Sequence, residues 1–236
     1  MQTVILAGGL GKRLMPLTRD IPKPMVPVLG RPFLEYQIRW LRSKGIRKIL
    51  LLTGYQGDKI QSYFGDGRSL GVVLAYSHEP GPLGTGGSLK LAENKLESSF
   101  LLLYGDSFLP MDFGGLIQRF RNADKTGMIV VYDSRQYDTG VPCNICLDKE
   151  GFVAGYKKGS MKPYYYIDAG ISVFKREVVD LISKKRKVSL EEEIFPRLIK
   201  KQELIAYISK QLFYDIGTHE RIKRFEEFLR SGTIKF

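Results

Sequence analysis

Residues 4–27 read VILAGGLGKRLMPLTRDIPKPMVP, and this stretch decides how the first part of the chain folds. A short apolar run of strand length, residues 4–7, breaks into glycine. Because glycine lacks a Cβ, the backbone can approach an anion closely and turn its N–H groups toward it. The order strand, glycine, cation therefore predicts a phosphate-binding loop rather than a tight turn with surface cations. The residues that follow the strand and carry this prediction are Gly8, Gly9, Gly11, Lys12, Arg13 and, between two prolines, Lys23.

The general glycine motifs do not describe this loop. A dinucleotide-binding G-x-G-x-x-G that starts at Gly9 would need glycine where Leu14 stands, and a P-loop would need Ser or Thr where Arg13 stands. The phosphate prediction therefore depends on the order of strand, glycine and cation alone.

Composition limits the partners. The 236 residues suffice for a single α/β domain, and no apolar run approaches membrane-spanning length, so we expect neither a leader nor a membrane partner. The net charge is +12, from 37 basic and 25 acidic residues, which suits nucleic acid or phosphorylated small molecules. The densest basic run, 184–187, contains no aromatic residue for base stacking and follows an amphipathic pattern at 178–182; we interpret it as a solvated helix end.

Two cysteines, Cys143 and Cys146, cannot complete a zinc site with two histidines, so we expect reduced thiols in a cytoplasmic protein.

Hydrophobic spacing alternates between strand and helix in the first half of the chain. It predicts a helix over 32–44, strands over 49–53 and 72–76, and a brief helix over 59–64. This order is typical of a parallel sheet covered on both faces, whose ligands bind beyond the carboxyl ends of the strands. From about residue 137 the pattern becomes that of a hairpin, with a turn at 148–151 and a long strand over 164–174.

Three further segments lie where such a sheet would bind a ligand. Residues 79–88 are rich in glycine and precede a helix predicted over 89–96. Asp106 follows the apolar strand 100–104, and Asp215 follows a short apolar run before the last helix. Each aspartate could simply satisfy local N–H groups at a helix start. Two carboxylates at two strand ends, however, are ligands that magnesium prefers beside phosphates.

The run A-G-G-x-G-x-R-L-x-P-L-T, followed by P-K-P-M, resembles the signature of the sugar-1-phosphate nucleotidylyltransferases. These enzymes join a nucleoside triphosphate to a sugar 1-phosphate and release pyrophosphate. The resemblance extends from Val4 to about Leu229. It implies an α/β fold of the GT-A-like, Rossmann-like type, with a mixed, mainly parallel sheet flanked by helices. It also implies one domain over 1–236, with a nucleotide-binding half over about 1–135 and a sugar-binding β lobe and C-terminal helix over about 136–236.

The resemblance further implies roles for single residues. Arg13 would hold the pyrophosphate end and Lys23 the α-phosphate, as the catalytic pair. Asp106 and Asp215 would hold Mg²⁺, the one cofactor implied. The implied sugar-binding residues are Asp106, Lys158, Asp168 and Gly170. The implied nucleotide-binding residues are Leu6, Ala7, Gly8, Gly9, Gly11, Lys12, Glu79, Leu83, Gly84 and Thr85.

Two positions depart from the family pattern and leave the sugar open. Asp168 stands where the family usually has Asn, and it cannot donate a hydrogen bond while ionised. Lys157 stands where an acidic residue usually precedes the lysine that corresponds to Lys158. For Asp168 a structural role, as an acceptor paired with a cation, is the alternative.

Within the family, the segment P-C-N-I is similar to one in short guanylyltransferases that act on heptose or mannose 1-phosphate. We therefore expect an enzyme of nucleotide-sugar and polysaccharide biosynthesis that uses GTP, without an appended C-terminal β-helix. The alternatives are a uridylyl- or thymidylyltransferase and a catalytically silent nucleotide-sugar sensor. A nucleic-acid-binding protein is the rival that the net charge suggests, and the expected partners are instead the nucleotide and the sugar 1-phosphate. A homodimer is possible.

Overall fold

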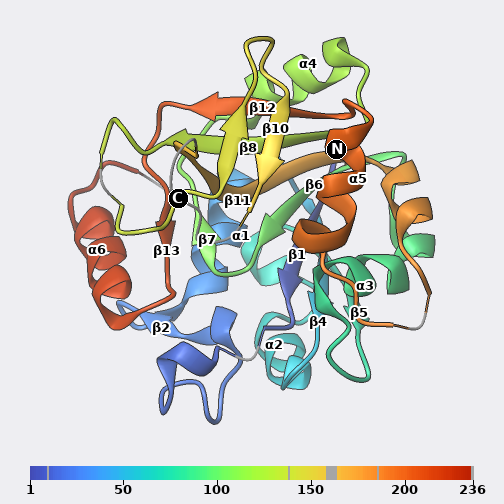
Figure 1. Cartoon of the computed structure of the whole chain (residues 1–236). Helices are drawn as coiled ribbons and strands as arrows, with labels where there is room; N and C mark the ends of the chain where they lie inside the picture. Colours follow the sequence, from blue (N-terminus) through green and yellow to red (C-terminus); the bar gives the residue numbers. More distant parts are fainter. Residues whose placement is uncertain (10, 138, 158–163, 185, 235–236) are drawn as a thin grey trace. The chain divides into compact units, whose positions relative to one another are not determined.

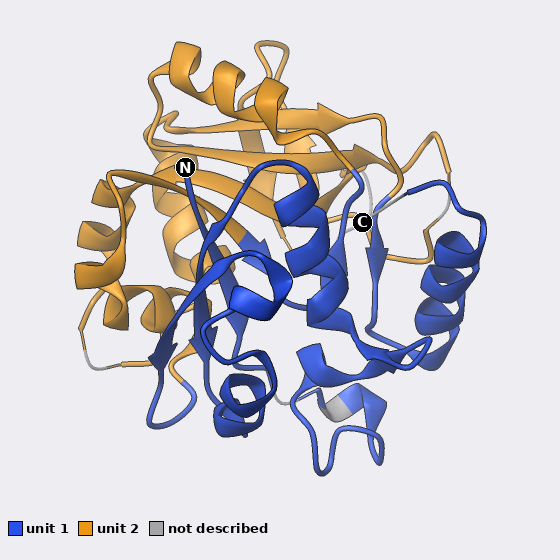
Figure 2. Cartoon of the chain, turned by 180° about the vertical axis from the view of Figure 1, so that it is seen from behind, with its two compact units in different colours: residues 1–82, 103–110, 213–236 blue, residues 83–102, 111–212 orange. Residues whose placement is uncertain are grey.

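The computed structural model describes residues 1–236 except 10, 138, 158–163, 185 and 235–236 (Figure 1). The chain forms two compact units, each assembled from separate segments (Figure 2). Unit 1 comprises residues 1–82, 103–110 and 213–236, and unit 2 comprises 83–102 and 111–212. The expected single domain, with halves meeting near residue 135, stays a prediction. Within the described residues, no helix has the length and apolar character that crossing a membrane requires.

Unit 1 contains the predicted parallel strands. β1 pairs with β4 and β4 pairs with β5, both in parallel, so that Leu6 lies opposite Leu52. The alternation of these strands with α1 and α2 confirms the β-α-β-α-β prediction. The elements of unit 1 are β1 (Gln2–Ala7), η1 (Lys12–Leu14), η2 (Lys23–Met25), β2 (Pro27–Val28), β3 (Arg31–Pro32), α1 (Phe33–Ser43), β4 (Lys48–Thr53), α2 (Gly57–Phe64), η3 (Arg68–Leu70), β5 (Val73–His78), β7 (Ser107–Phe108), β13 (Tyr214–Asp215) and α6 (His219–Arg230).

A cluster of aromatic rings fixes the C-terminal helix within unit 1. Phe225 of α6 is fully buried, and its ring centroid lies 5.1 Å from those of Phe33 and Phe108. Tyr214 of β13 stacks on Phe228 at 4.3 Å. Burial of several aromatic side chains contributes strongly to stability, so this cluster holds α6, α1 and the β7–β13 pair together.

Unit 2 is a mixed arrangement of strands. β9 and β10 form the predicted antiparallel hairpin, β11 runs antiparallel to β8, and β12 runs parallel to β8. Its elements are α3 (Gly84–Leu91), η4 (Glu93–Lys95), α4 (Phe113–Ala123), β8 (Gly127–Asp133), β9 (Ile145–Leu147), β10 (Val153–Tyr156), β11 (Tyr166–Lys175), η5 (Arg176–Leu181), the π-helix η6 (Leu190–Ile194), α5 (Phe195–Lys200) and β12 (Leu204–Ser209); β6 (Ser99–Tyr104) ends in unit 1.

Two predicted helices of unit 2 differ from those observed. The helix predicted over 89–96 begins at Gly84 and ends at Leu91, because the glycines form its first turn against the backbone of residues 186–188. The helix expected at 178–182 is the short 3₁₀ helix η5, which ends at Leu181 where Ile182 becomes extended. The basic run 184–187 therefore follows the helix instead of forming its last turn, and Lys185 lies outside the described residues.

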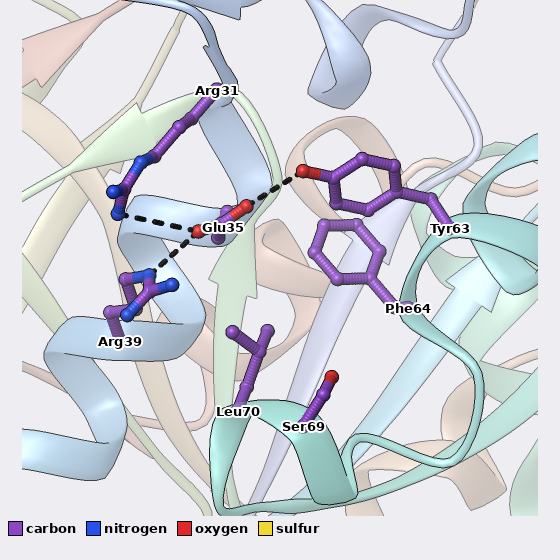
Figure 3. Close-up of a pocket in the computed structure, with 7 residues that line it drawn as sticks. All are labelled: Arg31, Glu35, Arg39, Tyr63, Phe64, Ser69 and Leu70. Carbon is purple, nitrogen blue, oxygen red and sulfur yellow. Dashed lines mark hydrogen bonds and ion pairs between the residues drawn. The ribbon is translucent and has the colours of Figure 1, made fainter.

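A buried carboxylate joins α1 to α2 in unit 1. Figure 3 shows Glu35 at the edge of a hollow of about 390 Å³. Its Oε1 accepts a hydrogen bond from Arg39 Nε at 2.7 Å and its Oε2 accepts one from Tyr63 Oη at 2.9 Å. Arg31 Nη1 lies 3.6 Å from Glu35 Oε1. Burial, and then the hydrogen bond to Glu35, raises the pKa of Tyr63. Glu35 thus provides a charged link between the two helices.

Glu35→Gln should lower the free energy of unfolding by about 1–2 kcal/mol, because a neutral amide replaces a buried, ionised acceptor. Urea denaturation followed by circular dichroism measures this change. Asp66→Asn is the matched control, since the Arg68–Asp66 pair is exposed at 89% and 62% and should contribute less than about 0.5 kcal/mol. Equal losses in the two variants would contradict the assigned role of Glu35.

Candidate functional site

The glycine loop follows the carboxyl end of β1, where Leu6 and Ala7 end the strand. The space that a Cβ on Gly9 would occupy is open, with no atom within 4 Å. Gly11 has a φ of +60° and packs against Thr18, whose hydroxyl donates to the Gly11 carbonyl at 2.9 Å. Leu14 is fully buried and anchors η1. The turn consequently leaves Arg13 exposed, while the side chain of Lys12 lies outside the described part.

Lys23 and Asp106 meet in the structure, although they are 83 residues apart in the sequence. Lys23 Nζ lies 2.5 Å from Asp106 Oδ2, and the two side chains are 11% and 35% exposed. The amide of Gly105 donates to the Leu6 carbonyl at 2.9 Å, and a Cβ on Gly105 would lie 2.6 Å from that oxygen. Glycine before the aspartate therefore lets the Asp106 loop lie against the end of β1.

Asp215 lies beside the Asp106 loop through the β7–β13 pair. Asp215 is opposite Ser107 in the register, and the amide of Ile216 donates to the Asp106 carbonyl at 3.0 Å. Asp215 Oδ1 accepts a hydrogen bond from the Gly217 amide at 2.7 Å. Arg221 Nη1 lies 3.1 Å from Oδ1 and 3.2 Å from Oδ2 of the same carboxylate. The structure therefore brings together both predicted metal ligands and adds an arginine that the sequence did not indicate.

These two carboxylates fit a magnesium ion in chemical type. They supply hard oxygen donors on adjacent backbone segments, and magnesium commonly takes one or two carboxylates together with phosphate oxygens. Among the residues that the structure describes, no group of three or more His, Cys, Asp or Glu side chains is placed to hold a metal by itself. A metal here would therefore complete its coordination with oxygens of water or of a bound phosphate.

A second hollow, of about 250 Å³, lies in unit 1 between Gly8 and residues 54–55 and 78–82. Glu79 is 8% exposed and forms part of its lining. A Cβ on Gly8 would lie 2.7 Å from Glu79 Oε1, and one on Gly54 would lie 2.5 Å from it. Glycine at both positions therefore makes room for a buried carboxylate next to the phosphate loop.

The predicted nucleotide residues of unit 2 already have partners within that unit. The amides of Gly86 and Val188 bond to the carbonyls of Val188 and Leu83, at 2.9 and 2.8 Å. Thr85 Oγ1 donates to Glu191 Oε2 at 2.7 Å. A Cβ on Gly84 would lie 2.6 Å from the Val188 carbonyl oxygen. Close packing on residues 186–188 thus explains the glycines of this segment, and ligand contacts for Leu83, Gly84 and Thr85 stay predictions.

Asp168 belongs to a polar network inside unit 2. Its Oδ1 accepts from the Gly170 amide at 2.8 Å, and its Oδ2 accepts from Tyr156 Oη at 2.9 Å. Burial raises the pKa of Asp168 to about 6, against the opposing effect of these two hydrogen bonds. Burial and the nearby Asp168 charge also raise the pKa of Tyr156. The described residues provide no cation for Asp168, and the predicted Lys158 lies outside them, while Lys157 is exposed.

Some contributors to the site gave no sequence signal. Gln37, on α1, donates to the carbonyls of Tyr104 and Ser107 at 2.9 and 2.6 Å, on either side of Asp106. Arg221 is one of several basic residues in an amphipathic helix. Each was indistinguishable from a core or surface residue until the tertiary contacts were known.

Known proteins resemble this chain over nearly its whole length. It is 35% identical to a mannose-1-phosphate guanylyltransferase of Mycobacterium tuberculosis over 95% of this chain, but it spans only 63% of that protein. It is 31% identical to a D-glycero-alpha-D-manno-heptose 1-phosphate guanylyltransferase of Campylobacter jejuni, covering 93% of this chain and 96% of the relative.

Solved structures agree in fold. HddC from Yersinia pseudotuberculosis superposes with a TM-score of 0.82 at 29% identity, covering 97% of this chain and 99% of that one, and it has also been solved in complex with GMP-PN. A putative glucose-1-phosphate thymidylyltransferase from Bacillus anthracis superposes with a TM-score of 0.86 at 22% identity, over 100% of this chain and 97% of that one. The α/β class with a mixed sheet and flanking helices is thus confirmed.

The sequence matches the family described as Nucleotidyl transferase over residues 2–232, and the glycine loop, Lys23 and Asp106 lie within that match. With its fold and its relatives in agreement, the chain belongs to the nucleotidyl transferase family.

Proposed function

We propose that the protein transfers GMP from GTP to a heptose or mannose 1-phosphate, giving a GDP-sugar and pyrophosphate. The observation that carries this proposal is the approach of Lys23 to Asp106, with Asp215 on the adjacent strand and the glycine loop beside them. The names of the relatives support guanine and these two sugars.

The chemistry requires positioning rather than a general base, because a sugar phosphate is already an anion. One of its oxygens attacks the α-phosphorus, and the bond from that phosphorus to the oxygen of the pyrophosphate group breaks. Lys23 would donate to the α-phosphate, and the exposed Arg13 would bind the departing pyrophosphate through its planar guanidinium. A magnesium ion held by Asp106 and Asp215 would neutralise charge on the phosphate oxygens.

Glu79 supports guanine as the base. The Watson–Crick edge of guanine offers two neighbouring donors, N1–H and the 2-amino group, and an ionised carboxylate only accepts hydrogen bonds. Uracil and thymine offer one donor between two carbonyl oxygens, and these oxygens would lie against the carboxylate charge. A buried Glu79 next to the phosphate loop therefore favours a guanine nucleotide.

Asp168, Gly170 and Lys158 remain the proposed sugar contacts, together with Asp106. Since Asp168 accepts from both Gly170 and Tyr156, it is already oriented before a sugar binds. It could accept a sugar hydroxyl when ionised and also donate when protonated.

The magnesium requirement, a cytoplasmic location and the absence of a nucleic-acid partner belong to the same proposal. The alternatives are a uridylyl- or thymidylyltransferase and a silent sensor. Pyrophosphate release, measured for five nucleoside triphosphates against a panel of sugar 1-phosphates, separates all of these from the proposed reaction.

Lys23→Met should lower kcat/KM by about 10²–10³-fold, because it removes a preorganised donor to the phosphate under attack. The methionine keeps most of the apolar stem, so the thermal unfolding midpoint should change little. Lys175→Met is the control: it breaks the Lys175–Asp124 pair of unit 2, at 2.7 Å, and should leave turnover intact. Comparable rates for Lys23→Met and wild type would refute the role of Lys23.

Glu79→Gln should lower kcat/KM for GTP by about 10–100-fold, the loss expected for one hydrogen bond to a charged acceptor. The preference for GTP over UTP should shrink at the same time, since the amide can both donate and accept. Steady-state pyrophosphate release with each nucleotide measures both changes, with the exposed Glu150→Gln as control. An unchanged GTP-to-UTP ratio would show that the base is selected elsewhere.

Ionisation of Asp168 should cost stability as the pH rises. The pKa is raised in the folded state, to about 6 from 3.8, so the unfolded chain loses this proton first and folding becomes less favourable between these two values. Asp168→Asn removes the titration and should gain about 1 kcal/mol over wild type between pH 5 and pH 7.5. Urea denaturation at both pH values tests this, and parallel stability profiles would disprove it.

A further inference from the structure

The ion pair between Arg221 and Asp215 has no part in the reaction as described above. Arg221 Nη1 is shared between both carboxylate oxygens, at 3.1 and 3.2 Å, and the two side chains are only 19% and 15% exposed. We propose that Arg221 is a positioning residue that competes with the divalent cation for Asp215. Arg221 releases the Asp215 carboxylate when the nucleotide binds. This inference rests on the proposed function for the identity of Asp215 as a metal ligand.

The backbone of Arg221 belongs to a rigid element. Thr218 caps α6 and its hydroxyl accepts from the Arg221 amide at 3.3 Å. Further along the same helix, Phe225 is fully buried in the aromatic cluster. Arg221 therefore projects from the anchored first turn of a helix, which keeps its backbone near Asp215 while its side chain can still rotate. A divalent cation approaching this carboxylate would meet a positive charge at contact distance.

A second arginine lies close to the same point. A Cβ placed on Gly217 would lie 3.3 Å from Arg221 Nη1 and 3.8 Å from Arg13 Nη2. Asp215 Oδ1 would lie 2.7 Å from the same position. The side chains of Arg221, Arg13 and Asp215 thus all lie near Gly217, and Asp106 is paired with Lys23. Among the described side chains of this cluster, three cations face two carboxylates, so the site has an excess of positive charge until an anion arrives.

A triphosphate supplies that anion. Its oxygens offer the arginines new acceptors in the bidentate geometry that guanidinium prefers. Once Arg221 turns toward phosphate, the oxygens of Asp215 become available to a cation. By linkage, the nucleotide should then tighten cation binding, and the cation should tighten nucleotide binding by the same factor.

Mn²⁺ titration of the full chain, with free Mn²⁺ followed by electron paramagnetic resonance, tests this competition without turnover. Without nucleotide, Arg221→Gln should bind Mn²⁺ on the order of tenfold more tightly than wild type, because a charge next to the ligand is removed. Arg221→Lys keeps the charge and should bind as weakly as wild type. Arg230→Gln, which removes the exposed Arg230 from its pair with Glu226 on the same helix, is the matched control and should not differ from wild type.

Two further measurements locate the effect. Adding Asp215→Asn to Arg221→Gln should abolish the gain in Mn²⁺ affinity. A GTP analogue that cannot transfer its nucleotide should tighten Mn²⁺ binding more in wild type than in Arg221→Gln. If Arg221 only tethers the loop, Arg221→Gln will bind Mn²⁺ no better than wild type, and the proposal is overturned.

Failure of the proposed function would give a different pattern. Pyrophosphate release would then be absent with GTP and the heptose or mannose 1-phosphates, while the difference in Mn²⁺ affinity between wild type and Arg221→Gln would persist. A normal rate of GMP transfer with equal Mn²⁺ affinities would instead remove only the role of Arg221.

Discussion

The ion pair of Lys23 with Asp106 is the contact on which the candidate site depends. Lys23 belongs to η2, whereas Asp106 follows β6. The pair forms because the loop at Gly105 lies directly against the end of β1. Gln37 then binds the backbone on both sides of Asp106, so helix α1 fixes the loop that carries the carboxylate. The apolar side of the same helix packs on the rings around Phe225. Core packing and the position of one charged group are therefore coupled in unit 1.

Charge explains why the candidate site would suit phosphate. Lys23 is paired with Asp106, and Arg221 is paired with Asp215. Each partly buried cation therefore has a carboxylate partner while no substrate is bound. Partly buried ion pairs hold their geometry but lose hydration, and an arriving anion can offer the cations equivalent partners. The net charge of +12 would attract such an anion from a distance, whereas the local pairs decide where it is held. The two effects act over different ranges and need different residues.

Unit 2 uses polar burial in another way. Asp168, Tyr156 and Asn144 bind one another, with Asn144 Oδ1 accepting the Asp168 amide at 3.0 Å. Thr85 and Ser189 both donate to Glu191, at 2.7 and 2.6 Å. Satisfied networks of this kind give a defined geometry, and their hydrogen bonds favour the ionised form of an acid, whereas burial favours its protonated form. The raised pKa of Asp168 follows from burial, and an aspartate at this position thereby makes this part of unit 2 sensitive to pH.

Local sequence determined the strand, the glycine loop, the alternating helices, the hairpin and the family, because these depend on periodicity, on turn chemistry and on a signature within 24 residues. It also indicated Lys23, Asp106 and Asp215 as members of one site. Only the tertiary structure decided what these residues contact. Gln37 and Glu79 contact segments distant in sequence, and Arg221 bonds to Asp215 from the first turn of the last helix. Gly84 and Gly86 pack closely on Val188. Hydrogen bonds and close approaches between distant segments depend on how the chain folds back on itself, and the hydrophobic pattern of any one segment does not encode them.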